Sequence, residues 1–525
     1  MKPRKKERIR KQLLKVSKER KKEMEKKKSL RRAGVLLPVS SLPSDCGIGT
    51  LGAGAYAFID WLSSANMKIW QVLPLLPTGY GDSPYQSCAS NALNPYFIDF
   101  ALLEKDGLLE RADWEDIEWC EDIRRVDYGK QFACKTHVLK KAYARFDKTN
   151  ENWLAFLKEG KYNDYALFMT LKTKFSYAPW TDWPEPYKNC EGKGLEEYIE
   201  ENAEEIGFWL FTQYIFLKQW NALRAYAKER GVSIMGDMPI YVSADSVETW
   251  KYRRQLFALD KEGNLSMRAG VPPDAFSEDG QLWGNPVYDW AKMKKDKYAW
   301  WKERIQYAFS LFDMVRIDHF RAFDRFYAIP DGAETAKEGE WLDGPKAELF
   351  KGMKKYSIVA EDLGTIDDGV RKLMEDTGFP GMKVFEFAFD GNPENEYLPI
   401  YYEKNCVAYT GTHDNDTLRS FLEEMPKMER KEFEKELEKQ CLALDSPYVV
   451  ETIEDECKSI MELLLASNAD TVIFPMHDIA VFGEEARLNA PSTVSAQNWT
   501  FRFVERDFGQ KKAAWLQSLT QLYKR

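Results

Sequence analysis

Three short acidic segments of this chain have the residue types needed for glycoside chemistry. They are 316–320 (RIDHF), 360–364 (AEDLG) and 412–417 (THDNDT), and each follows a short apolar run. Two carboxyl groups beside one sugar ring are enough to break or transfer a glycosidic bond. Asp318, Glu361 and Asp414 are therefore the candidate catalytic residues. A third carboxylate suits a site that stabilises a charged, sugar-like transition state.

The spacing of Arg316 and Asp318 suggests how one carboxylate is kept ionised. Residues two apart on a strand share a face, so the two side chains should lie together. A neighbouring guanidinium lowers the pKa of a carboxyl group, and an ionised carboxylate suits a nucleophile. Taken alone, this pair could also be a structural ion pair at the rim of a sheet, without a catalytic role.

The other two segments differ in their surroundings. Glu361 follows an apolar run, 358–360, and partly apolar surroundings raise the pKa of a carboxyl group so that it can donate a proton. Its neighbour Asp362 should face the other way. His413 either bonds sugar hydroxyls or is an ordinary buried histidine. From the residues alone, the choice of nucleophile stays open.

These segments end three of eight runs that we expect to be buried strands. The runs are 34–39, 69–74, 232–237, 314–318, 357–361, 382–387, 407–412 and 471–475. Helical patterns such as 56–65, 299–311 and 367–375 separate most of them, which indicates parallel strands with helical crossovers. The sequence therefore predicts an α/β protein, a (β/α)8 TIM barrel, whose active site lies at the C-terminal ends of the strands.

The chain divides by composition and pattern. Residues 1–32 hold 17 Lys/Arg and 4 Asp/Glu, whereas the other 493 residues hold 58 and 80. We expect 1–32 to be a solvated basic extension without a catalytic role, and 33–525 to be the catalytic barrel. A large, mostly helical insertion is predicted at about 100–231, between strands two and three, and a smaller one at about 427–468.

Composition excludes several classes. The acidic body is a poor nucleic-acid binder. No apolar run reaches the ~18 residues of a membrane span, and no signal-type segment follows the basic N-terminus. Eight Cys without CxxC spacing indicate reduced thiols and a cytoplasmic location, and four scattered His predict no metal centre. The aromatic content, 14%, is more readily explained by a large core than by sugar platforms.

One glycine motif matches a dinucleotide-binding pattern, but its surroundings do not support that function. Gly47-Ile48-Gly49-Thr50-Leu51-Gly52 matches the GxGxxG of dinucleotide-binding proteins. The expected strand lies too far upstream for a tight turn, and no acidic residue stands ~20 residues further on. We therefore expect no such cofactor, and we expect the glycines to let this loop approach a sugar.

Longer motifs give a family resemblance. They are 34–38 with 41–43, 79–86 (GYGDSPYQ), 236–239, 270–274 (GVPPD), 283–286 and 487–489, in addition to the acidic segments. In this order, from about Ala33 to Phe503, the chain resembles the 4-α-glucanotransferases, or amylomaltases, of glycoside hydrolase family 77. Ala322 stands where that family pattern leads us to expect glycine.

The resemblance implies roles for individual residues. Asp318 would be the nucleophile, Glu361 the acid and base, and Asp414 a stabiliser of the transition state. The loop from Gly270 to Gly284 would arch over the cleft. The implied substrate-binding residues are Ser83, Tyr85, Asp237, Phe276, Trp283, Arg316, His319, His413 and Asn489.

The implied reaction is the retaining transfer of an α-1,4-glucan segment through a covalent glucosyl-enzyme, in starch and glycogen metabolism and without a cofactor. Donors and acceptors would be α-1,4-glucans and maltooligosaccharides, with glucose as a further acceptor. An α-amylase-like hydrolase, with water as acceptor, is the alternative. A non-catalytic glycan-binding protein would tolerate Asn or Ala at 318, 361 or 414, but all three positions hold acidic residues. A metal-dependent hydrolase would need clustered His, and the sequence has no such cluster.

Overall fold

The computed structural model describes residues 31–79, 81–273, 278–364, 366–491 and 493–525. Eight parallel strands form its central sheet, in the order β10-β11-β12-β1-β2-β3-β6-β9. Each overlaps one predicted run, so all eight predicted strands are confirmed. Their bounds are β1 Arg32–Leu36, β2 Ile69–Gln71, β3 Ser233–Met238, β6 Met314–Ile317, β9 Ile358–Ala360, β10 Gly381–Val384, β11 Cys406–Tyr409 and β12 Thr471–Pro475.

The seam between β9 and β10 nearly closes this sheet into a barrel. The backbone N–H of Ala360 donates to the Pro380 carbonyl at 2.9 Å, and the N–H of Met382 donates to Oδ1 of Asp362 at 2.7 Å. The side chain of Asp362 therefore belongs to the barrel wall, turned away from its neighbour Glu361 as the alternation along a strand predicts. The predicted (β/α)8 barrel is confirmed.

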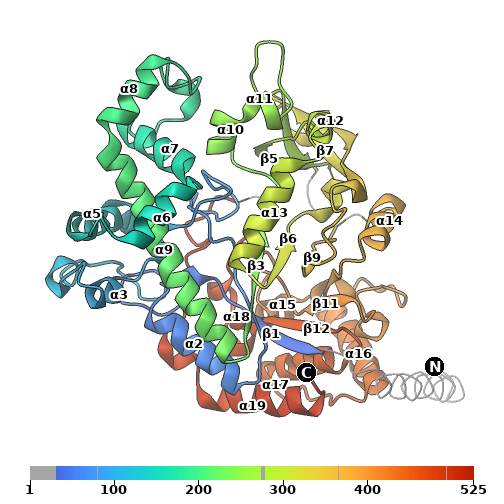
Figure 1. Ribbon diagram of the computed structural model, residues 1–525. Coiled ribbons are helices and arrows are strands. Elements are labelled where there is room, and N and C mark those ends of the chain that lie inside the picture. Colours follow the sequence, from blue (N-terminus) through green and yellow to red (C-terminus); the bar gives the residue numbers. More distant parts are fainter. Residues whose placement is uncertain (1–30, 80, 274–277, 365, 492) are drawn as a thin grey trace, which may run out of the picture.

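Helices cover the outside of the barrel, which explains why its strands are apolar on both faces (Figure 1). Helix α13, Ala299–Leu311, has the predicted bounds and contacts β3 and β6. Further covering helices are α2 Ala53–Ser64, α14 Asp368–Thr377, α17 Ile453–Ala466 and α19 Gln510–Leu522. Strand residues such as Val35, Ile69 and Ile317 are fully buried.

A group of helices separates β2 from β3, as predicted. They are α3 Phe100–Lys105, α4 Tyr128–Lys130, α5 Thr136–Arg145, α6 Glu151–Glu159, α7 Asn163–Lys174, α8 Lys193–Glu201 and α9 Ala203–Glu229. Figure 1 shows α5 to α8 standing beside the barrel. The long helix α9 contacts both α7 and β3, so it joins the inserted helices to the barrel. Between β11 and β12 lie α15 Leu418–Glu424, α16 Lys427–Leu444 and α17. The proposed domain boundaries stay a prediction.

A second, antiparallel sheet was not predicted. Its strands are β4 Met267–Val271, β5 Gln281–Pro286, β7 Arg325–Pro330 and β8 Glu340–Asp343, in the order β5-β4-β7-β8. We expected the whole segment from Gly270 to Gly284 to be a loop over the cleft. This expectation is wrong for the two ends of the segment, because they belong to strands β4 and β5. Glycine and proline hide the strand pattern there, and a Cβ on Gly270 would lie 2.1 Å from the Gln281 carbonyl oxygen.

The glycines of the 47–52 segment serve contacts within the protein. A Cβ on Gly49 would lie 1.8 Å from the Val39 carbonyl oxygen, and one on Gly52 would lie 1.9 Å from the Asp99 carboxylate. The expectation that these glycines approach a sugar is therefore wrong. The eight cysteines are all described, and none of them forms a disulfide. Across the described ranges, no helix combines the length and apolarity needed to cross a membrane.

Candidate active site

The C-terminal ends of β3, β6 and β9 place several predicted site residues together. These three strands are neighbours in the sheet. Asp237 lies on β3, Arg316 lies on β6 with Asp318 just after it, and Glu361 follows β9 directly. Parallel strands present their carboxyl ends at one edge, so the side chains converge on one rim of the barrel.

Arg316 is the centre of this group. Its Nη1 donates to both carboxylate oxygens of Asp237 at 2.8 Å, and its Nη2 lies 3.0 Å from Oδ1 of Asp318. The Arg316 side chain is almost fully buried, whereas that of Asp318 is 28% exposed. The guanidinium therefore fixes Asp318 while leaving part of the carboxylate open to a ligand.

The net pKa shift of Asp318 differs from the prediction. Burial raises the pKa of this carboxyl group, and the Arg316 guanidinium opposes the rise. The expected effect of Arg316 is present, but the expectation of a lowered pKa is wrong, because loss of water outweighs one ion pair in a buried site. The positive charge of Arg316 remains the feature that favours the ionised form.

Glu361 lies in different surroundings. Its carboxylate accepts hydrogen bonds from the backbone N–H of His319 at 2.6 Å and of Leu363 at 2.8 Å. Burial raises its pKa to about 7, although Arg316 and both N–H groups oppose the rise. The predicted upward shift is confirmed. A carboxyl group with this pKa can donate and accept a proton near neutral pH.

Asp414 lies beyond β11 and is held by polar neighbours. Asn489 donates from Nδ2 to Oδ1 of Asp414 at 2.6 Å, and Nε2 of His413 lies 3.3 Å from Oδ2. Arg487 donates to the Asp414 carbonyl at 3.1 Å and forms an ion pair with Asp416. These contacts fix the orientation of the carboxylate, and no Lys or Arg of the described ranges pairs directly with its oxygens.

Tyr85 joins the two sides of the rim. Its hydroxyl donates to Oδ2 of Asp237 at 2.9 Å, and its ring stacks on His413 with centroids 5.1 Å apart and planes 12° apart. The ring of Trp499 lies 5.8 Å from Tyr85 and 5.9 Å from His413. The structure thus brings predicted residues from β3, β6 and the β11 loop into one aromatic and polar wall.

The remaining predicted residues do not contact the three candidate catalytic carboxylates through their side chains in the contacts described below. Trp283 meets His319 edge to face, with centroids 4.9 Å apart, and burial lowers the pKa of His319 to about 3, so the imidazole is neutral. Ser83 accepts a hydrogen bond from the N–H of Tyr85 at 3.3 Å, which shapes the turn under that ring. Phe276 lies outside the described residues.

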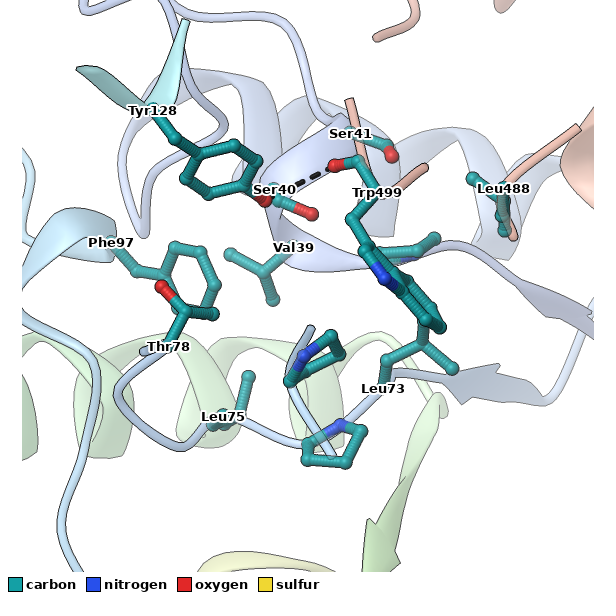
Figure 2. A pocket seen from close by; sticks show the side chains of 13 residues that line it. Val39, Ser40, Ser41, Leu73, Leu75, Thr78, Phe97, Tyr128, Leu488 and Trp499 are labelled. Carbon is teal, nitrogen blue, oxygen red and sulfur yellow. Dashed lines mark hydrogen bonds between the residues drawn. The ribbon is translucent and has the colours of Figure 1, made fainter. Parts of the chain in front are cut away.

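Trp499 is one of the residues that line a small cavity of about 20 Å³ (Figure 2). Leu73, Leu75 and Phe97 are among its apolar lining residues, and the Tyr128 hydroxyl donates to the Trp499 carbonyl at 3.1 Å. This volume is about that of one water molecule. The backbone of Trp499 has φ +65°, an uncommon value for a bulky residue, so neighbouring bonds hold it in place.

Sequence reasoning missed several supporting residues. They are Gln86, Asn285, Glu386, Asn415, Arg487 and Trp499. Gln86 and Asn285 bond to each other at 3.0 and 3.3 Å, and both lie within motifs that carried the family resemblance. Their positions within these motifs could have identified them as site residues from the sequence. Trp499 has no such signal, because it stands alone in a loop.

Carboxylates of unlike environment at the strand ends of a (β/α)8 barrel define a carbohydrate-active enzyme of the two-carboxylate class. In the part of the chain that the structure describes, no group of three or more His, Cys, Asp or Glu side chains is arranged to hold a metal ion. The carboxyl groups themselves support acid–base and nucleophilic chemistry.

Comparisons with known proteins give the family. The family model for glycoside hydrolase family 77, described as 4-alpha-glucanotransferase, matches residues 37–506. A 4-alpha-glucanotransferase of Clostridium butyricum is 42% identical, over 93% of this chain and 99% of its own length. One from Streptococcus pneumoniae is 39% identical, over 94% and 97%.

Solved structures agree. An amylomaltase from Streptococcus agalactiae, in complex with acarbose, superposes with a TM-score of 0.89 at 38% identity, over 94% of this chain and 99% of that chain. An amylomaltase from Corynebacterium glutamicum shares the fold, with a TM-score of 0.73 at 17% identity, over 93% and 75%. The chain belongs to glycoside hydrolase family 77, the 4-alpha-glucanotransferases. The predicted class of enzyme is confirmed, and the α-amylase-like hydrolase is not favoured.

Proposed function

We propose that this protein transfers α-1,4-glucan segments with Asp318 as nucleophile and Glu361 as the acid and base. The observation that carries the proposal is the contrast between these two carboxyl groups. Asp318 lies 3.0 Å from a buried guanidinium, whereas Glu361 has a pKa of about 7 and, among the described residues, accepts hydrogen bonds only from backbone N–H groups. Unlike environments are how one site assigns different roles to two carboxyl groups.

The first step forms a covalent glucosyl-enzyme. Protonated Glu361 gives its proton to the glycosidic oxygen as Oδ of Asp318 attacks the anomeric carbon, so the bond to the leaving sugar breaks as an ester bond to Asp318 forms. In the second step, ionised Glu361 takes the proton of an acceptor 4-hydroxyl, which attacks the same carbon and releases Asp318. Two inversions retain the α configuration.

The other residues would bind the sugar at this site. Asp414, oriented by Asn489 and His413, would bond ring hydroxyls and stabilise positive charge on the ring. Tyr85, stacked on His413, offers a flat face to an apolar sugar surface. Arg316, Asp237, Ser83 and His319 would contribute polar contacts, and Trp283 and Phe276 a platform for the glucan.

We also propose the finer substrate range. Donors and acceptors would be α-1,4-glucans and maltooligosaccharides, with glucose as a further acceptor, in starch or glycogen metabolism in the cytoplasm. The names of the relatives, and the acarbose complex of the S. agalactiae protein, support oligosaccharide substrates. Eight free thiols are consistent with a reducing compartment.

Incubation with maltotriose alone, followed by separation of the products by size, tests this proposal. Transfer predicts glucose and a ladder of longer maltooligosaccharides, at a constant number of reducing ends. Rising reducing ends with only shorter sugars would instead make water the acceptor. An unchanged substrate would contradict the proposed donor range.

A further inference from the structure

The turn that carries His413 and Asp414 is held from within by Asn415. Oδ1 of Asn415 accepts from the N–H of Thr412 at 2.9 Å and from its hydroxyl at 2.8 Å. The Thr412 hydroxyl in turn accepts from the N–H of Asp414 at 3.2 Å. Because a backbone N–H only donates, the Asn415 oxygen must face Thr412 and its amide nitrogen must point the other way.

Glu386 receives that amide nitrogen. It lies in the short helix Phe385–Ala388 directly after β10, next to β11 in the sheet. Nδ2 of Asn415 donates to Oε2 of Glu386 at 3.0 Å. The backbone N–H of Glu386 also donates to the carbonyl of Thr410, at 3.4 Å. A chain of hydrogen bonds therefore runs from Glu386 through Asn415 and Thr412 to Asp414.

The surroundings of Glu386 disfavour a charge. Its Oε1 is buried and, within the described residues, has no hydrogen-bond partner. Arg487, a nearby cation, pairs with Asp416. Asp478 is committed to Thr410 and to the N–H of Leu418, at 2.5 and 2.8 Å. An ionised Glu386 would be a buried charge beside two other carboxyl groups.

We propose that Glu386 is a positioning residue of the transfer reaction: by accepting a hydrogen bond from Asn415, it fixes the turn that presents His413 and Asp414. Burial raises the pKa of Glu386 well above its ordinary value, Asp478 and Asp416 add to the rise, and Asn415 and Arg487 oppose it. The effect on catalysis passes through Asp414, so this inference rests on the proposed function.

Substitutions of Glu386 separate shape from charge. Glu386→Gln keeps an oxygen that accepts from Asn415 and carries no charge, so its kcat/KM should stay within about twofold of the parent. Glu386→Ala removes the acceptor, and kcat should fall roughly 10- to 100-fold, with KM changing less, because misplaced groups cost rate at the transition state. Glu394→Ala, at an exposed glutamate eight residues away, is the matched control and should change neither.

A double-mutant cycle tests the route through Asn415. Asn415→Ala should reproduce the loss seen in Glu386→Ala, and the double variant should lose little more, because both changes break one chain of bonds. Thermal unfolding of every variant shows whether the chain is folded. A folded Glu386→Ala variant with parental kcat, additive losses in the cycle, or a Gln variant as slow as the Ala variant would overturn the proposal.

A failure of the proposed function is seen separately. It would appear as a parent protein that makes no transfer products. The role of Glu386 would then be tested by titration calorimetry with maltotetraose. Glu386→Ala should weaken binding at least fivefold and Glu386→Gln should not, and equal affinities for all three proteins would overturn the inference.

Discussion

Arg316 and Asp318 lie side by side on the rim of the barrel, with Nη2 of the guanidinium 3.0 Å from the carboxylate. The same guanidinium holds Asp237 through Nη1. The planar guanidinium thus links residues of two strands and orients Asp318, the proposed nucleophile, which a single point charge would not do.

Arg316→Lys tests this geometry. A lysine ammonium keeps the charge but reaches only one carboxylate well, so kcat should fall about 100-fold while the protein stays folded. Steady-state transfer from maltotriose gives the rate, and thermal unfolding checks the fold. Arg268→Lys, at a partly exposed ion pair with Asp331, is the control and should have parental activity. An Arg316→Lys enzyme with parental kcat would show that the planar guanidinium is dispensable.

The pKa of Glu361 predicts how rate depends on pH. The first step of the proposed mechanism needs protonated Glu361, whose pKa is about 7. The value of kcat/KM should therefore fall roughly tenfold per unit as pH rises beyond this value. Glu361→Gln should be nearly inactive, and its residual rate should lack this fall. A parental profile that is flat from pH 6 to about 9 would contradict the assignment of the acid.

The raised pKa of Glu361 also predicts that this residue lowers the free energy of unfolding at high pH. The folded chain holds a proton on Glu361 up to about pH 7, whereas the unfolded carboxyl group loses it near its ordinary value of 4.5. This contribution to stability is full below the unfolded pKa and is lost as pH rises through the folded one. Between pH 4.5 and pH 8, the free energy of unfolding of Glu361→Gln should therefore rise by up to about 3 kcal/mol relative to that of the parent. A cost that does not vary with pH is superimposed, because the amide nitrogen cannot accept from one of the two backbone N–H groups that bond the carboxylate. A difference between the two proteins that did not vary with pH would contradict the prediction.

Asp362 should matter for stability through the barrel seam. Asp362→Ala leaves the buried N–H of Met382 without its acceptor, so the free energy of unfolding should fall by about 1 to 3 kcal/mol. Asp362→Asn retains an acceptor oxygen and should lose much less. Chemical denaturation compares the two variants. Equal losses of unfolding free energy in the two variants would mean that the charge of Asp362, and not this hydrogen bond, stabilises the contact between β9 and β10.

The basic N-terminal extension should be dispensable for catalysis. Removal of residues 1–30 should leave kcat and KM near parental values, because every site residue lies beyond it. Removal of residues 1–32 should lower the melting temperature, because Arg31 donates to two carbonyls, of Leu465 and Ser467, and Arg32 begins β1. A large fall in kcat for the shorter deletion would show that the extension contributes to the site.

The sequence predicts the barrel well because its strands are short apolar runs that end in charged motifs. It predicts where Glu361 lies and the sign of its pKa shift for the same reason. The net shift of Asp318 depends on burial in three dimensions, which spacing to Arg316 does not reveal. Strands β4 and β5 escape detection because glycine and proline interrupt their pattern. The hydrogen bond between Glu386 and Asn415 joins two residues 29 positions apart, in the segments that follow the neighbouring strands β10 and β11, and no sequence motif pairs these two residues.

The most direct test of the account is to identify the residue that carries the sugar. Glu361→Gln treated with α-maltosyl fluoride should accumulate the intermediate, because fluoride leaves without an acid while the second step lacks its base. Mass spectrometry of the digested protein should find one maltosyl group on the peptide that contains Asp318, and none when Asp318→Asn is added. A maltosyl group on any other residue, or its persistence in the double variant, would contradict the assignment of Asp318 as nucleophile.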